Sequence, residues 1–103
     1  MDRAALETLL KSTHLPVVYH HFVTPPKPPY IIYLFALSNN FGADNKVYDK
    51  ADRYQVELYT AKKDSASEAT LEAVLDAAET YWDKTETYIE SEKLYQIIYE
   101  ITI

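Results

Sequence analysis

The chain contains no cysteine and a single glycine among its 103 residues. The lack of cysteine excludes disulfides and thiolate metal sites, and it is typical of an intracellular protein. With Gly42 alone, the glycine-rich loops that cradle phosphates are excluded as well, since they need several glycines in a fixed pattern. We expect Gly42 to supply a positive φ angle in a turn instead.

Basic residues are scarce compared with acidic ones. Ten Lys and Arg stand against 16 Asp and Glu, which gives a formal net charge of -6. Because phosphate contacts need clustered Lys and Arg, we expect no general affinity for nucleic acid. An acidic surface suits a passage through which DNA slides without adhering, but many soluble proteins are acidic for other reasons. No apolar run is long enough to span a bilayer, and the acidic N-terminus lacks the apolar core of an export signal.

Tyrosine is abundant, with ten residues against three phenylalanines and one tryptophan. A tyrosine side chain joins an apolar ring to a polar tip, and it therefore suits strands, rims and protein interfaces. Two interpretations stay open at this point: a tyrosine-rich sheet, or an excess of interface tyrosines.

The hydrophobic pattern predicts one domain spanning residues 1–103, with the order α-β-β-β-α-β-β. Helices are expected at 4–11 and 67–83, and strands at 17–22, 30–37 and 52–60, followed by a hairpin that turns near Ser91 and Glu92. Residues 24–30, "TPPKPPY", read as a stiff extended connection between the first two strands. The predicted fold class is α+β: a mainly antiparallel sheet of about five strands, one main amphipathic helix packed on a face, and a short N-terminal helix.

The main helix carries the clearest periodicity. Its apolar positions should face the sheet, and Ser65 with Glu68 has the spacing of a capping box. The strand at 30–37 is apolar without alternation, which predicts burial on both faces. The positions that recur at helical spacing are Leu71, Val74, Leu75, Ala78, Tyr81 and Trp82, and all of them except Tyr81 are expected to be buried against the sheet.

No arrangement of residues predicts catalysis or metal binding. His20 and His21 are adjacent, so on a strand they would point to opposite faces and could not share a metal. The aspartates at 44, 49 and 52 lack the alternate spacing of a calcium loop. The acids of the last hairpin are typical of a solvated face, although a general acid and base pair is a question of geometry. We therefore expect no catalytic residues, no cofactor and no metal.

The stretch "SNNFGADNKVYDK" connects two predicted strands and is too long for a tight turn. We expect a long loop at about residues 38–51. Loops of that length in compact domains are usually functional or disordered, and this one carries apolar residues of its own. The stretch is therefore predicted to become ordered against a neighbouring subunit or partner. The candidate interface residues are Asn39, Asn40, Phe41, Asp44, Asn45, Lys46, Val47 and Tyr48.

Residues 29–103 resemble a family of small phage and prophage proteins from Gram-positive hosts. The similarity is carried by Asn40, Asp44, Asn45, Val47 and Tyr48 before "ELYT", by the helix "EATLEAVLDAAETYWDK", and by "ESEKLYQIIYEI" near the end. The family is that of tail terminators, also called tail completion or head-tail joining proteins.

The resemblance implies an α+β structural virion protein at the junction of tail and head, assembled in the host cytoplasm, with no catalysis and no cofactor. It implies a homo-oligomeric ring, most simply a hexamer. The ring caps the tail tube, contacts the tail tube protein and the head connector proteins, and lets DNA pass without specific binding. Two other classes stay open: another connector or neck protein, and a small enzyme or ligand-binding domain with a deep pocket.

Overall fold

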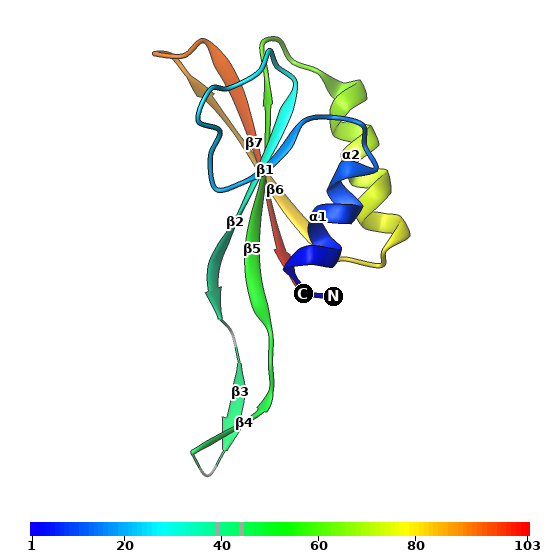
Figure 1. Ribbon diagram of the computed structural model, residues 1–103, viewed down its shortest axis with the longest axis vertical. Coiled ribbons are helices and arrows are strands. Elements are labelled where there is room, and N and C mark those ends of the chain that lie inside the picture. The colour runs from blue at the N-terminus through cyan, green and yellow to red at the C-terminus, as the bar shows by residue number, and fades with distance from the viewer. Residues whose placement is uncertain (39, 44) are drawn as a thin grey trace.

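The computed structural model describes residues 1–38, 40–43 and 45–103, with the backbone alone for Phe41, Ala43, Val47, Tyr48 and Asp49. Two helices and a five-stranded sheet form the body, and a second, two-stranded sheet lies outside it (Figure 1). The elements are α1 (Arg3–Lys11), β1 (Val17–Tyr19), β2 (Tyr30–Ser38), β3 (Phe41–Ala43), β4 (Lys46–Asp49), β5 (Asp52–Thr60), α2 (Ser65–Ala77), β6 (Trp82–Ile89) and β7 (Leu94–Thr102). The predicted α+β class is confirmed.

The main sheet has the strand order β1-β2-β5-β7-β6. Only the short contact between β1 and β2 is parallel; the other pairings are antiparallel, including the predicted pairing of β2 with β5. The turn between β6 and β7 covers residues 90–93, as the sequence predicted. β5 and β7 occupy the middle of the sheet, where they supply most of the buried strand residues.

Both helices lie on the same side of the sheet (Figure 1). Each begins with an aspartate cap: the Asp2 carboxylate accepts from the Ala5 N–H, and the Asp64 carboxylate accepts from the Ser67 N–H. The helices and the sheet enclose one core of fully buried side chains, which removes most of the apolar surface from water. Its members with essentially no exposure include Leu6, Leu10, Ile31, Tyr33, Val56, Leu58, Leu71, Leu75, Ile97, Tyr99 and Ile101.

Three predictions about α2 are wrong. The cap is Asp64 and not Ser65, and Glu68 binds lysines instead of closing a capping box. The helix ends at Ala77, because Glu79 adopts a left-handed φ of 55°. The Glu79 N–H then donates to the Asp76 carbonyl and the Thr80 N–H to the Leu75 carbonyl, a Schellman arrangement that satisfies the last carbonyls.

The apolar positions of the main helix have mixed outcomes. Leu71 and Leu75 are fully buried, Val74 is half-buried, and Ala78 is exposed. Trp82 belongs to β6, but it still lies over the core, with its ring against Tyr99 and its Nε1–H donating to the Asp76 carboxylate. Trp82 is thus apolar because it joins the sheet to the end of α2, and its spacing from Ala78 in the sequence is helical only by coincidence.

Two strand predictions also need correction. β1 ends at Tyr19 instead of residue 22, because His20 takes a positive φ of 70° and leaves the sheet. β2 is buried only over its first half: from Phe35 to Ser38 it runs beyond the helices, and its side chains are exposed. Burial on both faces therefore holds at most for residues 30–34.

Candidate functional site

The outer ends of β2 and β5 continue into the β3–β4 hairpin and project away from the body (Figure 1). We call residues 35–52 the arm. The arm gives the molecule its elongated shape, 49 Å long against 29 and 23 Å in the other directions. The radius of gyration is 14.7 Å, compared with about 13 Å for a compact domain of this length.

The described part of the predicted loop is therefore mainly a β-ribbon. β3 and β4 pair antiparallel, with Gly42 opposite Val47 and Ala43 opposite Lys46. The Asn40 side chain fastens the base of the ribbon, because its Oδ1 accepts from the Ala51 N–H at 3.0 Å. The stretch that sequence reasoning treated as an irregular loop thus has a backbone that can present strand edges to a partner.

The prediction for Gly42 is wrong: its φ is not positive. A Cβ atom at this position would lie 2.9 Å from the Lys46 carbonyl oxygen. That distance is too short, so the glycine is explained by the close approach of the two strands. Asn45 takes the left-handed conformation instead, with a φ of 62°, which asparagine tolerates well.

Most of the candidate interface residues lie together on the arm. Their described backbone runs along both strands of the ribbon and its turn. Asn39 and Asp44 lie outside the described residues, as do the side chains of Phe41, Val47 and Tyr48. The residues brought together are Asn40, Phe41, Asn45, Lys46, Val47 and Tyr48.

Sequence reasoning missed the exposed apolar side chains at the base of the arm. Phe35 is 43% exposed and Leu37 is 48% exposed. The Phe35 ring packs edge to face against Tyr54, with 5.8 Å between ring centroids. The signal was present in the sequence, since the apolar run continues to residue 37, further than the helices can cover.

The opposite edge of the sheet is formed by β6. All side chains from Asp83 to Tyr88 are exposed, and among the described residues no strand lies beyond β6. Tyr81, just before this strand, is 78% exposed, and Tyr88 near its end is 44% exposed. Sequence reasoning placed Tyr81 on a helix and so missed this aromatic edge.

A cluster of charges fastens α2 to the sheet. Glu68, only 4% exposed, accepts from Lys63 at 2.7 Å and from Lys84 at 3.1 Å. Burial alone would raise the pKa of Glu68, but the two ammonium groups outweigh it and hold the pKa below its ordinary value. Lys84 also donates to Glu72, which accepts from the Tyr99 hydroxyl at 2.7 Å.

The charges in this cluster neutralise one another and join α2 to the sheet. Each of its glutamates is held by at least one lysine, and hydrogen bonds to Glu68 and Glu86 raise the pKa of Lys63. Burial and the bond to Glu72 raise the pKa of Tyr99. A general acid and base pair needs one carboxyl that holds a proton near neutral pH, and the pKa of Glu68 is shifted the other way.

The two neighbouring histidines do not point to opposite faces, contrary to the prediction. Both lie beyond the end of β1, and their Nδ1 atoms are 3.1 Å apart. The two rings therefore form a hydrogen bond with each other. No third ligand completes a metal site: the described residues contain no group of three or more His, Asp or Glu side chains placed to hold an ion.

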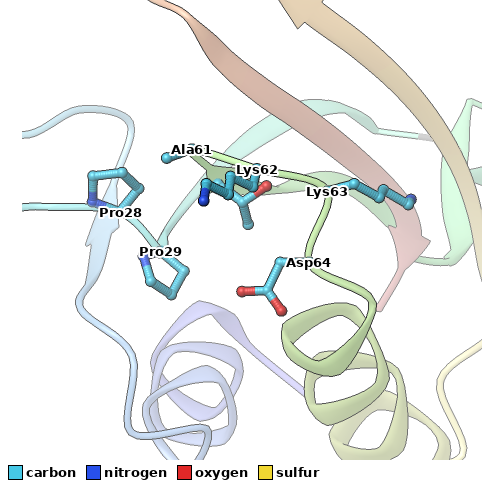
Figure 2. Close-up of a pocket in the computed structure, with 7 residues that line it drawn as sticks. Pro28, Pro29, Ala61, Lys62, Lys63 and Asp64 are labelled. Carbon is cyan, nitrogen blue, oxygen red and sulfur yellow. The ribbon is translucent and has the colours of Figure 1, made fainter.

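A shallow pocket of about 380 Å³ lies between the proline-rich segment and the start of α2 (Figure 2). Its one carboxylate, Asp64, points toward Pro29 and is already engaged by the N–H and hydroxyl of Ser67. Those bonds keep the pKa of Asp64 below its ordinary value, and they make Asp64 the cap of α2. The lining residues are Pro28, Pro29, Thr60, Ala61, Lys62, Lys63 and Asp64.

The fold and the site define an α+β domain with a projecting β-arm and an open sheet edge. No protein-family model matches the chain, and no curated protein is significantly similar to it in sequence. Within the described residues, no helix has the length and apolar character needed to cross a membrane.

Proposed function

We propose that this protein is a phage tail terminator: a ring of identical subunits, most simply six, that caps the tail tube and joins the tail to the head connector. The observation that carries the proposal is the projecting arm, which holds one of the three segments on which the resemblance to tail terminators depends. An arm of this kind, outside the core and with exposed apolar residues at its base, fits contact with a neighbouring subunit.

The arm and the body have separate tasks in this proposal. The body folds on its own core, so the subunit can be made and stored before assembly. The arm, none of whose described side chains belongs to that core, is free to contact a neighbouring copy or the tail tube protein. The net charge of -6 suits a channel through which DNA passes without adhering.

The charged cluster and the pocket offer no competing catalytic function. The carboxylates described in them accept hydrogen bonds from lysines, from the Tyr99 hydroxyl or, for Asp64, from the N–H and hydroxyl of Ser67. A different station in the head-tail connector is the remaining alternative, and the phenotype of a disrupted gene distinguishes it from a terminator.

The test is a host strain in which this gene is disrupted in its phage or prophage. We expect tails of uncontrolled length beside filled heads without tails, and we expect the intact gene supplied in trans to restore normal particles. Tails of normal length that fail to attach to heads would indicate another connector protein. Tails of normal length that attach to heads would refute the proposal altogether.

A further inference from the structure

The two free edges of the main sheet lie on opposite sides of the molecule. On one side β6 ends the sheet along its whole length. On the other side β1 pairs only with residues 31–33 of β2, so the outer edge of β2 beyond that point has no strand beside it among the described residues. The Phe35 N–H on this edge is met by the Tyr19 hydroxyl at 3.3 Å, and the edge is open beyond it.

Exposed apolar side chains gather at these same two edges. Six large hydrophobic side chains are exposed in the described residues, and four of them belong here: Phe35 and Leu37 on β2, and Tyr81 and Tyr88 beside or on β6. Single exposed apolar residues are ordinary on a protein surface. Here, exposed apolar side chains lie at a strand edge without a neighbouring strand on both sides of the sheet, and this coincidence indicates an interface.

The two edges carry only part of the usual protection against pairing. Natural edge strands are often blocked by proline, by charged side chains or by β-bulges. Residues 34–38 and 82–89 contain no proline, but β2 has a register irregularity between Phe35 and Leu37, and β6 carries three charged residues, Asp83, Lys84 and Glu86. Two charged residues of β6, Lys84 and Glu86, are drawn over the helix face by α2 and Lys63. The other exposed positions include small side chains that leave room for a neighbouring strand: Ala36, Ser38, Thr85 and Thr87.

We propose that the outer edge of β2 in one copy pairs with the β6 edge of a second copy of this chain, so that the sheet continues from subunit to subunit. The occupant of each edge is therefore the other edge of the same protein. Strand addition supplies backbone hydrogen bonds, and Phe35 and Leu37 would meet the aromatic rim of β6. This inference rests on the proposed ring and names the surfaces that build it.

Joining two different edges makes the contact heterologous, and a heterologous contact repeated by a closing rotation gives a ring. Pairing β6 with β6 would instead give a twofold dimer. The proposal also gives the β3–β4 ribbon a role: a two-stranded ribbon is marginal alone, and next to a neighbour's sheet it gains a packing surface.

The absence of native cysteine allows a direct test by disulfide trapping. One set of chains carries Ala36→Cys or Ser38→Cys, and the other carries Thr85→Cys or Thr87→Cys. Paired strands lie about 4.8 Å apart, within the Cα separation that a disulfide spans. The sets are mixed, assembled at the highest soluble concentration or on purified tail tubes, and oxidised. Thr70→Cys, exposed on α2, is the matched control.

We expect disulfides between the β2 set and the β6 set, with little or none within one set or with the control. A second test needs no oxidation. Leu37→Lys should weaken association about tenfold or more, whereas Val23→Lys, at a residue that is 96% exposed and belongs to no strand, should not.

Each outcome of the trapping experiment is decisive. Disulfides within the β6 set would show twofold pairing and overturn the inference. A closed six-subunit ring without the mixed disulfide would overturn the inference while leaving the proposed function standing. The mixed disulfide in an assembly of another size would support the edge pairing and contradict the hexamer. A chain that never assembles, even on tail tubes, would overturn both.

Discussion

At the scale of single residues, Glu68 and Leu75 show two ways in which α2 is held to the sheet. Leu75 is fully buried in the core. Glu68 is nearly buried too, but it is a carboxylate, and two partly exposed lysines compensate its charge. The stability that Leu75 contributes should not depend on pH, whereas the stability that Glu68 contributes should.

Truncation of Leu75 tests the apolar contact. Leu75→Ala should lower the free energy of unfolding by about 2–5 kcal/mol, because it removes buried methyl groups and leaves a cavity. Thr70→Ala, on the exposed face of the same helix, should change it by about 0.5 kcal/mol or less. Urea denaturation of both variants is the measurement, and an unchanged midpoint for Leu75→Ala would contradict the described packing.

Replacement of Glu68 tests the ionic contact. Glu68→Gln should lower the free energy of unfolding by about 1–2 kcal/mol near neutral pH, a modest value because both lysines are partly solvated. The pKa of Glu68 is lower in the folded protein than its ordinary value of 4.5. Its stabilisation is therefore fully present above that value and lost as the pH falls through the folded pKa.

The difference between wild type and Glu68→Gln should accordingly shrink as the pH is lowered below about 4.5. Unfolding curves collected from neutral to acidic pH give this difference directly. A gap that stays constant over the whole range would show that Glu68 is not held ionised by Lys63 and Lys84.

At the scale of elements, the sequence could predict β2, β5 and β7, the antiparallel pairing of β2 with β5, and the final hairpin. The period-two pattern of β5 and β7 and the apolar length of β2 identified those strands correctly. The end of α2 could not be predicted, because the residue in the left-handed position is Glu79 where glycine is usual. Trp82 and Tyr81 then prolonged the helical spacing by coincidence.

The arm was predictable as an insertion but not as a ribbon. Its polar composition gives no strong strand signal, and the two strands are short. What closes them is local: the Asn40 bond to Ala51, the left-handed Asn45 and the close approach at Gly42. Such contacts depend on side-chain direction and backbone angles, which hydrophobic periodicity does not report.

Deletion of residues 39–51 from the arm tests whether the body folds without them. Ser38 and Asp52 are directly paired, so residues 39–51 can be replaced by an Asn-Gly turn. We expect a folded protein whose free energy of unfolding changes by about 1 kcal/mol or less, since none of the side chains that the structure describes in the deleted segment belongs to the core. We also expect loss of assembly. Circular dichroism gives the folded state, and a variant that fails to fold would contradict the separation between a body that folds and an arm that serves assembly.

At the scale of the whole molecule, the charge of the protein makes a prediction about DNA. The net charge of -6 disfavours phosphate contacts. Fluorescence anisotropy with duplex DNA at physiological salt should therefore show binding weaker than about 10⁻⁴ M, the weak limit of ordinary non-specific binding. Tighter binding that falls steeply with added salt would contradict a passage through which DNA slides freely.

The symmetry and position of the assembly on isolated tails test the central claim most directly. Electron microscopy of purified tails should show a closed ring of this protein at the head-proximal end of the tube. The ring should contain six copies joined by one repeated contact between two different surfaces. A twofold dimer, a single copy, or a location elsewhere in the particle would contradict the account.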